Sequence, residues 1–174
     1  MQWKPMIEGA FGYNYMLTEK LVEMVNDSEL NWKPTIGNNW MNMGQLLRHI
    51  GSACGSPVKG FVTGDWGFPS DMDPTKLSFE EIVPPVDKLL PVSSVKDAKD
   101  RLAEDKKTAY LYLGKCSEDD LDKKMIQAPW NPIDLPLGQR LMESALHLNQ
   151  HKGQLFYYLK MQGKPVHTGH LWGM

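Results

Sequence analysis

Residues 137–162 read LGQRLMESALHLNQHKGQLFYYLKMQ, a long stretch with the spacing of a single helix. Apolar residues recur along it at steps of three and four, which places them on one helix face. They are Leu141, Ala145, Leu148, Leu155 and Leu159. Gly163 follows directly, and a glycine commonly ends a helix. The stretch therefore predicts an amphipathic helix that buries one side.

Three further stretches carry the same periodicity, at residues 6–25, 43–61 and 94–114. Asn42 precedes the second, and Gln45 three residues on completes the pattern of a capping box. Gly44, Gly51 and Gly55 share one face of this second helix and indicate a close contact with a neighbouring helix. Little of the remaining sequence is typical of a strand.

The connection over residues 63–93 is long and contains five prolines. A connection of this length inside a compact domain is usually functional or carries small elements of its own. Four amphipathic helices with one long crossover are typical of a bundle. The expected fold is all-α, a four-helix bundle with the crossover between helices two and three, in one domain over residues 1–174.

Composition narrows the classes of function. The formal net charge is -2 and the basic residues are scattered among acidic ones, so no nucleic-acid partner is expected. Apolar runs fall short of the roughly 18 residues of a membrane span, and the N-terminus lacks the features of a signal peptide. Cys54 and Cys116 do not form a disulfide framework. These features predict a cytoplasmic protein with free thiols.

Three histidines suggest a metal site. His147 and His151 lie four residues apart, so on a helix their side chains stand one turn apart on the same face. His49, on the second helix, borders the apolar face and falls in a polar stripe. Facing helices of bundles build metal sites in this way. We expect one divalent ion, although packed or exposed histidines without a metal give the same spacing.

Other polar residues flank these histidines. Arg140 and Tyr158 fall on the same stripe of the last helix as the histidine pair, and Asn14 lies within the apolar face of the first helix. Each is a candidate contact for a metal-binding histidine or for a substrate, while Asn14 could equally satisfy a backbone group. His167 and His170 lie in a glycine-rich tail. This tail is expected to be mobile, or to fold back over the cleft that the polar stripes of the second and last helices would form.

The sequence resembles the DinB/YfiT superfamily of metalloenzymes. The resemblance rests on GQLLRHIG around His49, on HLNQHKGQLFYYLKMQG around His147 and His151, and on the four-helix layout. It implies that these three histidines hold a nickel or zinc ion with other positions open. It also implies that many members are homodimers, and that relatives include thiol-dependent S-transferases and a mycothiol-dependent isomerase.

The functions that follow from these features fall into three classes. The first is a metal-dependent transferase that acts on a low-molecular-weight thiol. A zinc peptidase is disfavoured because position 148 is leucine, where the H-E-x-x-H motif needs glutamate; Asp105 and Glu143 are weak candidates for a base elsewhere. The second is a metal-binding or stress-related protein without turnover. The third is a metal-free dimeric module, with Met142, Leu146 and Phe156 on the outer face of the last helix.

Overall fold

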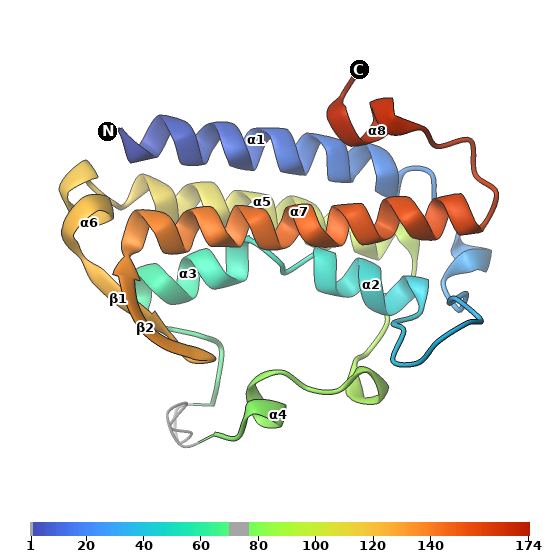
Figure 1. Cartoon of the computed structure of the whole chain (residues 1–174), viewed down its shortest axis with the longest axis horizontal. Coiled ribbons are helices and arrows are strands. Elements are labelled where there is room, and N and C mark those ends of the chain that lie inside the picture. The colour runs from blue at the N-terminus through green and yellow to red at the C-terminus, as the bar shows by residue number, and fades with distance from the viewer. Residues whose placement is uncertain (1, 70–76) are drawn as a thin grey trace.

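The computed structural model describes residues 2–69 and 77–174, and these residues are mainly helical (Figure 1). Residues 70–76 of the crossover lie outside the described residues. The helices are α1 (Trp3–Val22), α2 (Met43–Ile50), α3 (Gly55–Thr63), α4 (Phe79–Ile82), α5 (Val95–Gly114), α6 (Glu118–Lys123), α7 (Leu137–Met161) and α8 (Thr168–Trp172). Short 3-10 helices span Asp27–Glu29 and Val86–Lys88. The strands are β1 (Met125–Ala128) and β2 (Asn131–Pro136).

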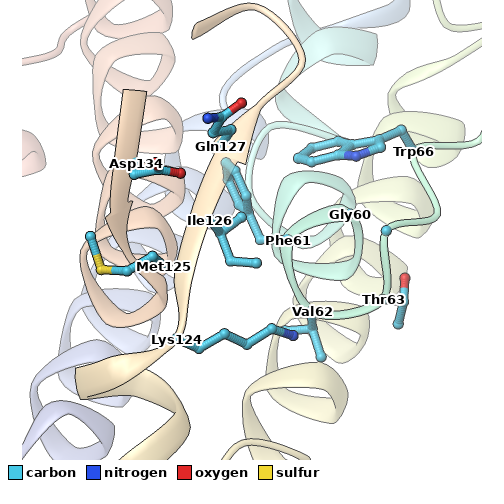
Figure 2. Close-up of a pocket in the computed structure, with 11 residues that line it drawn as sticks. Gly60, Phe61, Val62, Thr63, Trp66, Lys124, Met125, Ile126, Gln127 and Asp134 are labelled. Carbon is cyan, nitrogen blue, oxygen red and sulfur yellow. The ribbon is translucent and has the colours of Figure 1, made fainter. Parts of the chain in front are cut away.

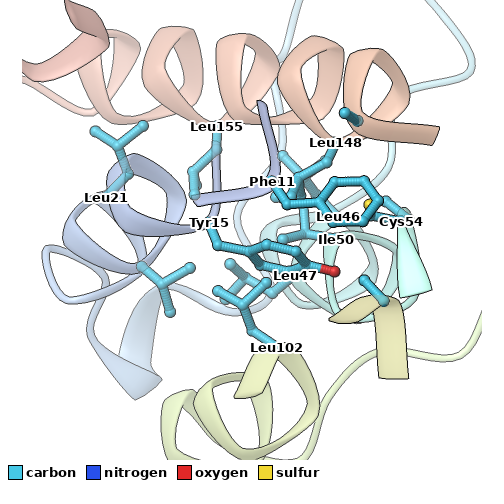
Figure 3. Close-up of a cluster of buried hydrophobic side chains, with 14 of the residues drawn as sticks. Phe11, Tyr15, Leu21, Leu46, Leu47, Ile50, Cys54, Leu102, Leu148 and Leu155 are labelled. Carbon is cyan, nitrogen blue, oxygen red and sulfur yellow. The ribbon is translucent and has the colours of Figure 1, made fainter. Parts of the chain in front are cut away.

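The core lies where four helical segments meet. α1 packs on α5 and α7, while α2 and α3 follow one another along the other side of the same two helices (Figure 1). Phe11 from α1, Leu46 from α2, Leu102 from α5 and Leu148 from α7 converge there (Figure 3). The apolar face predicted for residues 137–162 is buried, which confirms that periodicity. Phe156 is 2% exposed, so its predicted place on the outer face is wrong.

The second predicted helix is broken. It was expected to be continuous over residues 43–61, but α2 ends at Ile50 and α3 begins at Gly55. Pro57 gives a physical reason, because it has no N–H to donate to the carbonyl of Ala53 four residues earlier. The capping box predicted at Asn42 and Gln45 is confirmed by hydrogen bonds in both directions, of 2.8 and 2.9 Å.

A small antiparallel sheet corrects the purely helical prediction. β1 and β2 pair before α7, with a register shift between Ile126 and Ala128. The hairpin is held by Arg140, whose guanidinium donates to the carbonyls of Ile126, Asn131 and Ile133. Strands this short carry little periodic signal, and the side chain that secures them belongs to the following helix.

The ends of the connections are anchored to the helices. The Gln45 side chain donates to the carbonyls of Val86 and Leu89, which ties the end of the crossover to α2. At the C-terminus, α8 packs on α1 and α7 (Figure 1). Among the described helices, none has both the length and the apolar character needed to cross a bilayer.

Candidate metal centre

Three histidine side chains meet between α2 and α7. His49 comes from the last turn of α2, and His147 and His151 come from successive turns of α7. The Nε2 atom of His49 lies 3.2 Å from that of His147 and 3.0 Å from that of His151, and the latter two are 3.0 Å apart. The structure thus brings together the three residues that the sequence indicated, and they could hold a metal ion.

The spacing of these nitrogens matches a face of a metal coordination sphere. With metal–nitrogen bonds of about 2.0–2.1 Å, two ligands lie about 2.9 Å apart in octahedral and about 3.4 Å apart in tetrahedral coordination. The three observed separations fall within this range. The residues therefore fit one ion bound by three nitrogens on one side.

Hydrogen bonds on the far sides of two rings fix their tautomers. The Nδ1–H of His147 donates to the carbonyl of Ala53 at 2.8 Å, and the Nδ1–H of His151 donates to Oε1 of Gln154 at 3.0 Å. Both acceptors lack a proton to give, so each ring carries its hydrogen on Nδ1. The Nε2 lone pairs of these two residues then face each other with no proton between them, an arrangement that a cation would stabilise.

The electrostatics of the cluster favour neutral imidazoles. Burial, together with the nearby rings of His151 and His147, lowers the pKa of His49 to about 3. Burial also lowers the pKa of His147 and of His151, partly offset by their hydrogen bonds to Ala53 and Gln154. Because a metal competes with protons for the same lone pairs, neutral rings are prepared to bind one.

A chain of side chains supports His151. Gln154, which orients the ring, donates through Nε2 to the hydroxyl of Tyr158 at 3.3 Å. That hydroxyl donates to the carbonyl of Met41 at 2.9 Å, just before α2. The indole of Trp32 packs edge-on against the Tyr158 ring. Tyr158, predicted to contact a metal-binding histidine or a substrate, is thus connected to the cluster through Gln154.

The other two candidate contacts have backbone partners. Asn14 is buried and its amide donates to the carbonyls of Ala10 and Ala145, which joins α1 to α7. Arg140 is 2% exposed and bonds the hairpin carbonyls and Glu143. Among the described residues, no hydrogen bond joins either side chain to the three histidines.

The remaining candidates lie outside the cluster. The Nδ1 atom of His167 caps α8 by accepting from the backbone N–H of Gly169. The backbone N–H of His167 donates to Nδ1 of His170. Asp105 is buried, with both carboxylate oxygens accepting hydrogen bonds, and Glu143 pairs with Arg140. Of the described acidic, histidine and cysteine side chains, only the three histidines form a group suited to a metal.

Sequence reasoning missed two supports of the site. Gln154 lies three residues after His151 on the same helix, so helical spacing was a signal for it. The Ala53 carbonyl left no such signal, because it reaches His147 only where the second helix is broken. Pro57 and the glycines at positions 51 and 55 were the local signs of that break.

A cavity of about 470 Å³ lies elsewhere, between the end of α3 and the start of the hairpin (Figure 2). Phe61, Trp66 and Ile126 form its apolar walls, and Lys124 and Asp134 bring charge to it. None of the three histidines lines it. The cavity is therefore separate from the histidine cluster.

Comparison with known proteins identifies relatives of this fold. The structure resembles a crystal structure of a DinB-like protein from Bacillus subtilis, with a TM-score of 0.64 and 17% identity over 92% of this chain and 94% of that chain. It also resembles a protein assigned to the DinB family from Exiguobacterium sibiricum, with a TM-score of 0.67 and 17% identity over 98% of each chain. No curated protein matches the sequence. The sequence profile of the DinB superfamily matches residues 10–155, and the chain therefore belongs to the DinB superfamily.

Proposed function

We propose that this protein binds one nickel or zinc ion through His49, His147 and His151 and acts as a metal-dependent transferase on a low-molecular-weight thiol. The observation that carries the metal is the convergence of three Nε2 atoms at 3.0–3.2 Å. Two of these atoms have their lone pairs directed inward by hydrogen bonds behind the ring. We interpret α1, the α2–α3 pair, α5 and α7 as the four members of the bundle that presents them.

Three protein ligands distinguish a catalytic site from a structural one. A structural zinc site is closed by four protein ligands, whereas a catalytic site keeps at least one position for a small molecule. A bound divalent ion would lower the pKa of a thiol that occupies such a position and hold it as a nucleophile. The thiol as substrate rests on the resemblance to S-transferases, and the three neutral donors are consistent with it.

The proposed reaction is a nucleophilic substitution. The sulfur of the thiol forms a bond to an electrophilic carbon, the leaving group departs with its electron pair, and the thiol proton passes to solvent. The residues of this chain hold the site in shape: Gln154 and the Ala53 carbonyl orient two rings, and Tyr158 fixes Gln154 against Met41.

The first experiment measures metal content by elemental mass spectrometry on tag-free protein. We expect about one equivalent of metal per chain in the parent, and its loss in His151→Ala. The matched control is His167→Ala, which removes an imidazole that lies outside the cluster and should retain the metal. A parent that neither contains metal nor takes up nickel or zinc would contradict the proposal and favour a helical interaction module.

The second experiment tests turnover. The nickel- and zinc-loaded parent is mixed with small thiols and a chromogenic aryl halide, and thioether formation is followed by absorbance. Thiol-dependent turnover that is lost in His151→Ala but kept in His167→Ala would support the transferase. Stoichiometric metal binding without turnover across a broad set of thiols and electrophiles would favour a metal-binding protein without catalysis.

A further inference from the structure

A buried carboxylate joins three helices next to the metal centre. Asp105 of α5 is 5% exposed. Its Oδ2 accepts from the hydroxyl of Tyr15 on α1 at 2.7 Å and from the backbone N–H of Cys54 at 3.2 Å. Its Oδ1 accepts from the backbone N–H of Ser56 at 3.1 Å. This carboxylate therefore has several donors despite its burial.

The position of Asp105 follows from the break between α2 and α3. The first turn of a helix has N–H groups without partners inside the helix, and a side chain at the N-cap usually accepts from one of them. Cys54 occupies the N-cap of α3 and makes no such bond. Asp105 takes over this role from another helix. The close approach requires glycine at position 55, where a Cβ would lie 2.1 Å from the backbone oxygen of Asp105.

One peptide group links this carboxylate to a histidine of the cluster. The carbonyl of Ala53 and the N–H of Cys54 belong to the same peptide unit. The carbonyl accepts from Nδ1 of His147 at 2.8 Å, and the N–H donates to Asp105 at 3.2 Å. Because a trans peptide directs its C=O and N–H to opposite sides, His147 and Asp105 hold this unit between them.

We propose that Asp105 is a positioning residue of the metal centre, which acts on His147 through the Ala53–Cys54 peptide group. The inference rests on the proposed metal site. In many metal sites a carboxylate accepts directly from the outer nitrogen of a histidine ligand and fixes its orientation. Here a peptide group stands between the two. A negative charge at its N–H polarises the unit and makes its carbonyl a stronger acceptor for His147. Tyr15 holds the carboxylate in place from α1.

The first test needs no metal. Asp105→Asn removes the negative charge and leaves one oxygen in place of two to accept from Cys54 and Ser56, so the peptide unit should be held less firmly. Nitrogen-15 NMR of the metal-free parent should show the hydrogen of the His147 ring on Nδ1. The spectrum of Asp105→Asn should show a mixture of tautomers, and Tyr15→Phe a smaller shift in the same direction.

The second test is metal affinity, measured by competition of the parent and variants with a chelator for nickel and for zinc. Loss of an outer partner of a metal ligand typically weakens binding by about 10–100-fold. For Asp105→Asn we expect a loss of about tenfold, near the lower end of that range, because the contact is indirect. The matched controls are Asp97→Asn, a capping carboxylate on the same helix, and Tyr110→Phe, which also loses a tyrosine hydroxyl bond.

The outcomes separate this inference from the proposed function. A parent that binds no metal would contradict the proposed function. Asp105 has no positioning role if Asp105→Asn and Tyr15→Phe show the same His147 tautomer and the same metal affinity as their control variants. Should Asp105→Asn fail to fold, Tyr15→Phe decides, because it leaves the carboxylate in place. A tautomer shift in Tyr15→Phe that is absent in Tyr110→Phe would then support the inference.

Discussion

The contact between α3 and α5 makes Gly55→Ala an informative substitution. A Cβ at position 55 would lie 2.1 Å from the backbone oxygen of Asp105 and 2.8 Å from its Oδ1. Ordinary carbon–oxygen contacts are about 3.3 Å or longer, so the start of α3 would have to move by about 1 Å. The nearest atom belongs to the backbone of α5, which cannot rotate away as a flexible side chain would.

The expected effect on stability follows from two opposing terms. Overpacking costs about 1–3 kcal/mol, and the hydrogen bonds from Cys54 and Ser56 to the carboxylate would lengthen as well. The gain from replacing glycine by alanine within a helix is at most about 1 kcal/mol. We therefore expect the free energy of unfolding to fall by about 1–3 kcal/mol.

Urea unfolding followed by circular dichroism measures this difference. The matched control is Gly153→Ala in the middle of α7, where a new Cβ meets no atom within 4 Å. That variant should be more stable than the parent, by up to about 1 kcal/mol. Equal stability of Gly55→Ala and the parent would refute the close contact. A similar loss in both variants would refute the assignment of the effect to α5.

Three further predictions concern the cluster and the hairpin. Gln154→Leu removes the acceptor of His151 and should weaken nickel or zinc binding about tenfold in a chelator competition, whereas Gln150→Leu on the same helix should not. Arg140→Met leaves hairpin carbonyls without their donor and should lower the free energy of unfolding by about 3 kcal/mol; equal urea midpoints for this variant and the parent would contradict the anchoring role. The pKa of His49 is lowered to about 3 when folded, but unfolded histidine titrates near about 6.5, so the unfolded chain takes up the proton first as pH falls. Between about pH 6.5 and 3 the metal-free parent should lose more stability on acidification than His49→Gln, and parallel pH profiles of the urea midpoint would contradict this.

The histidine pair of α7 could be predicted from local spacing, whereas the full set of three histidines also rested on the resemblance to the DinB/YfiT superfamily. His147 and His151 are neighbours on any helix, and the polar stripe of the second helix supplied His49 at a matching depth. The buried faces of the long helices were predictable for the same reason, because helical periodicity alone selects residues such as Leu148 and Leu155.

The parts that sequence could not predict depend on contacts between distant segments. Helical periodicity predicted that the second helix continues through residues 51–54, where the structure has a break. Pro57 was the strongest sequence feature against a continuous helix. The break is stable because Asp105, some 50 positions later, accepts the N–H groups that it exposes. Arg140 was placed beside the histidines by its stripe, but the carbonyls that it binds come from a hairpin that periodicity did not reveal.

The two oriented histidines depend on different parts of the fold, so a local disturbance of the structure would affect His147 and His151 unequally. His151 is held by Gln154 on its own helix, so this contact survives wherever α7 is helical. The contact of His147 exists only while the Ala53–Cys54 peptide stays between α5 and α7. A ligand that binds only the folded arrangement stabilises it, by an amount that grows with the logarithm of the ligand concentration divided by its Kd. An ion bound by the three histidines would therefore stabilise the observed α2–α3 junction. A change that disturbs this junction should displace His147 before it displaces His151.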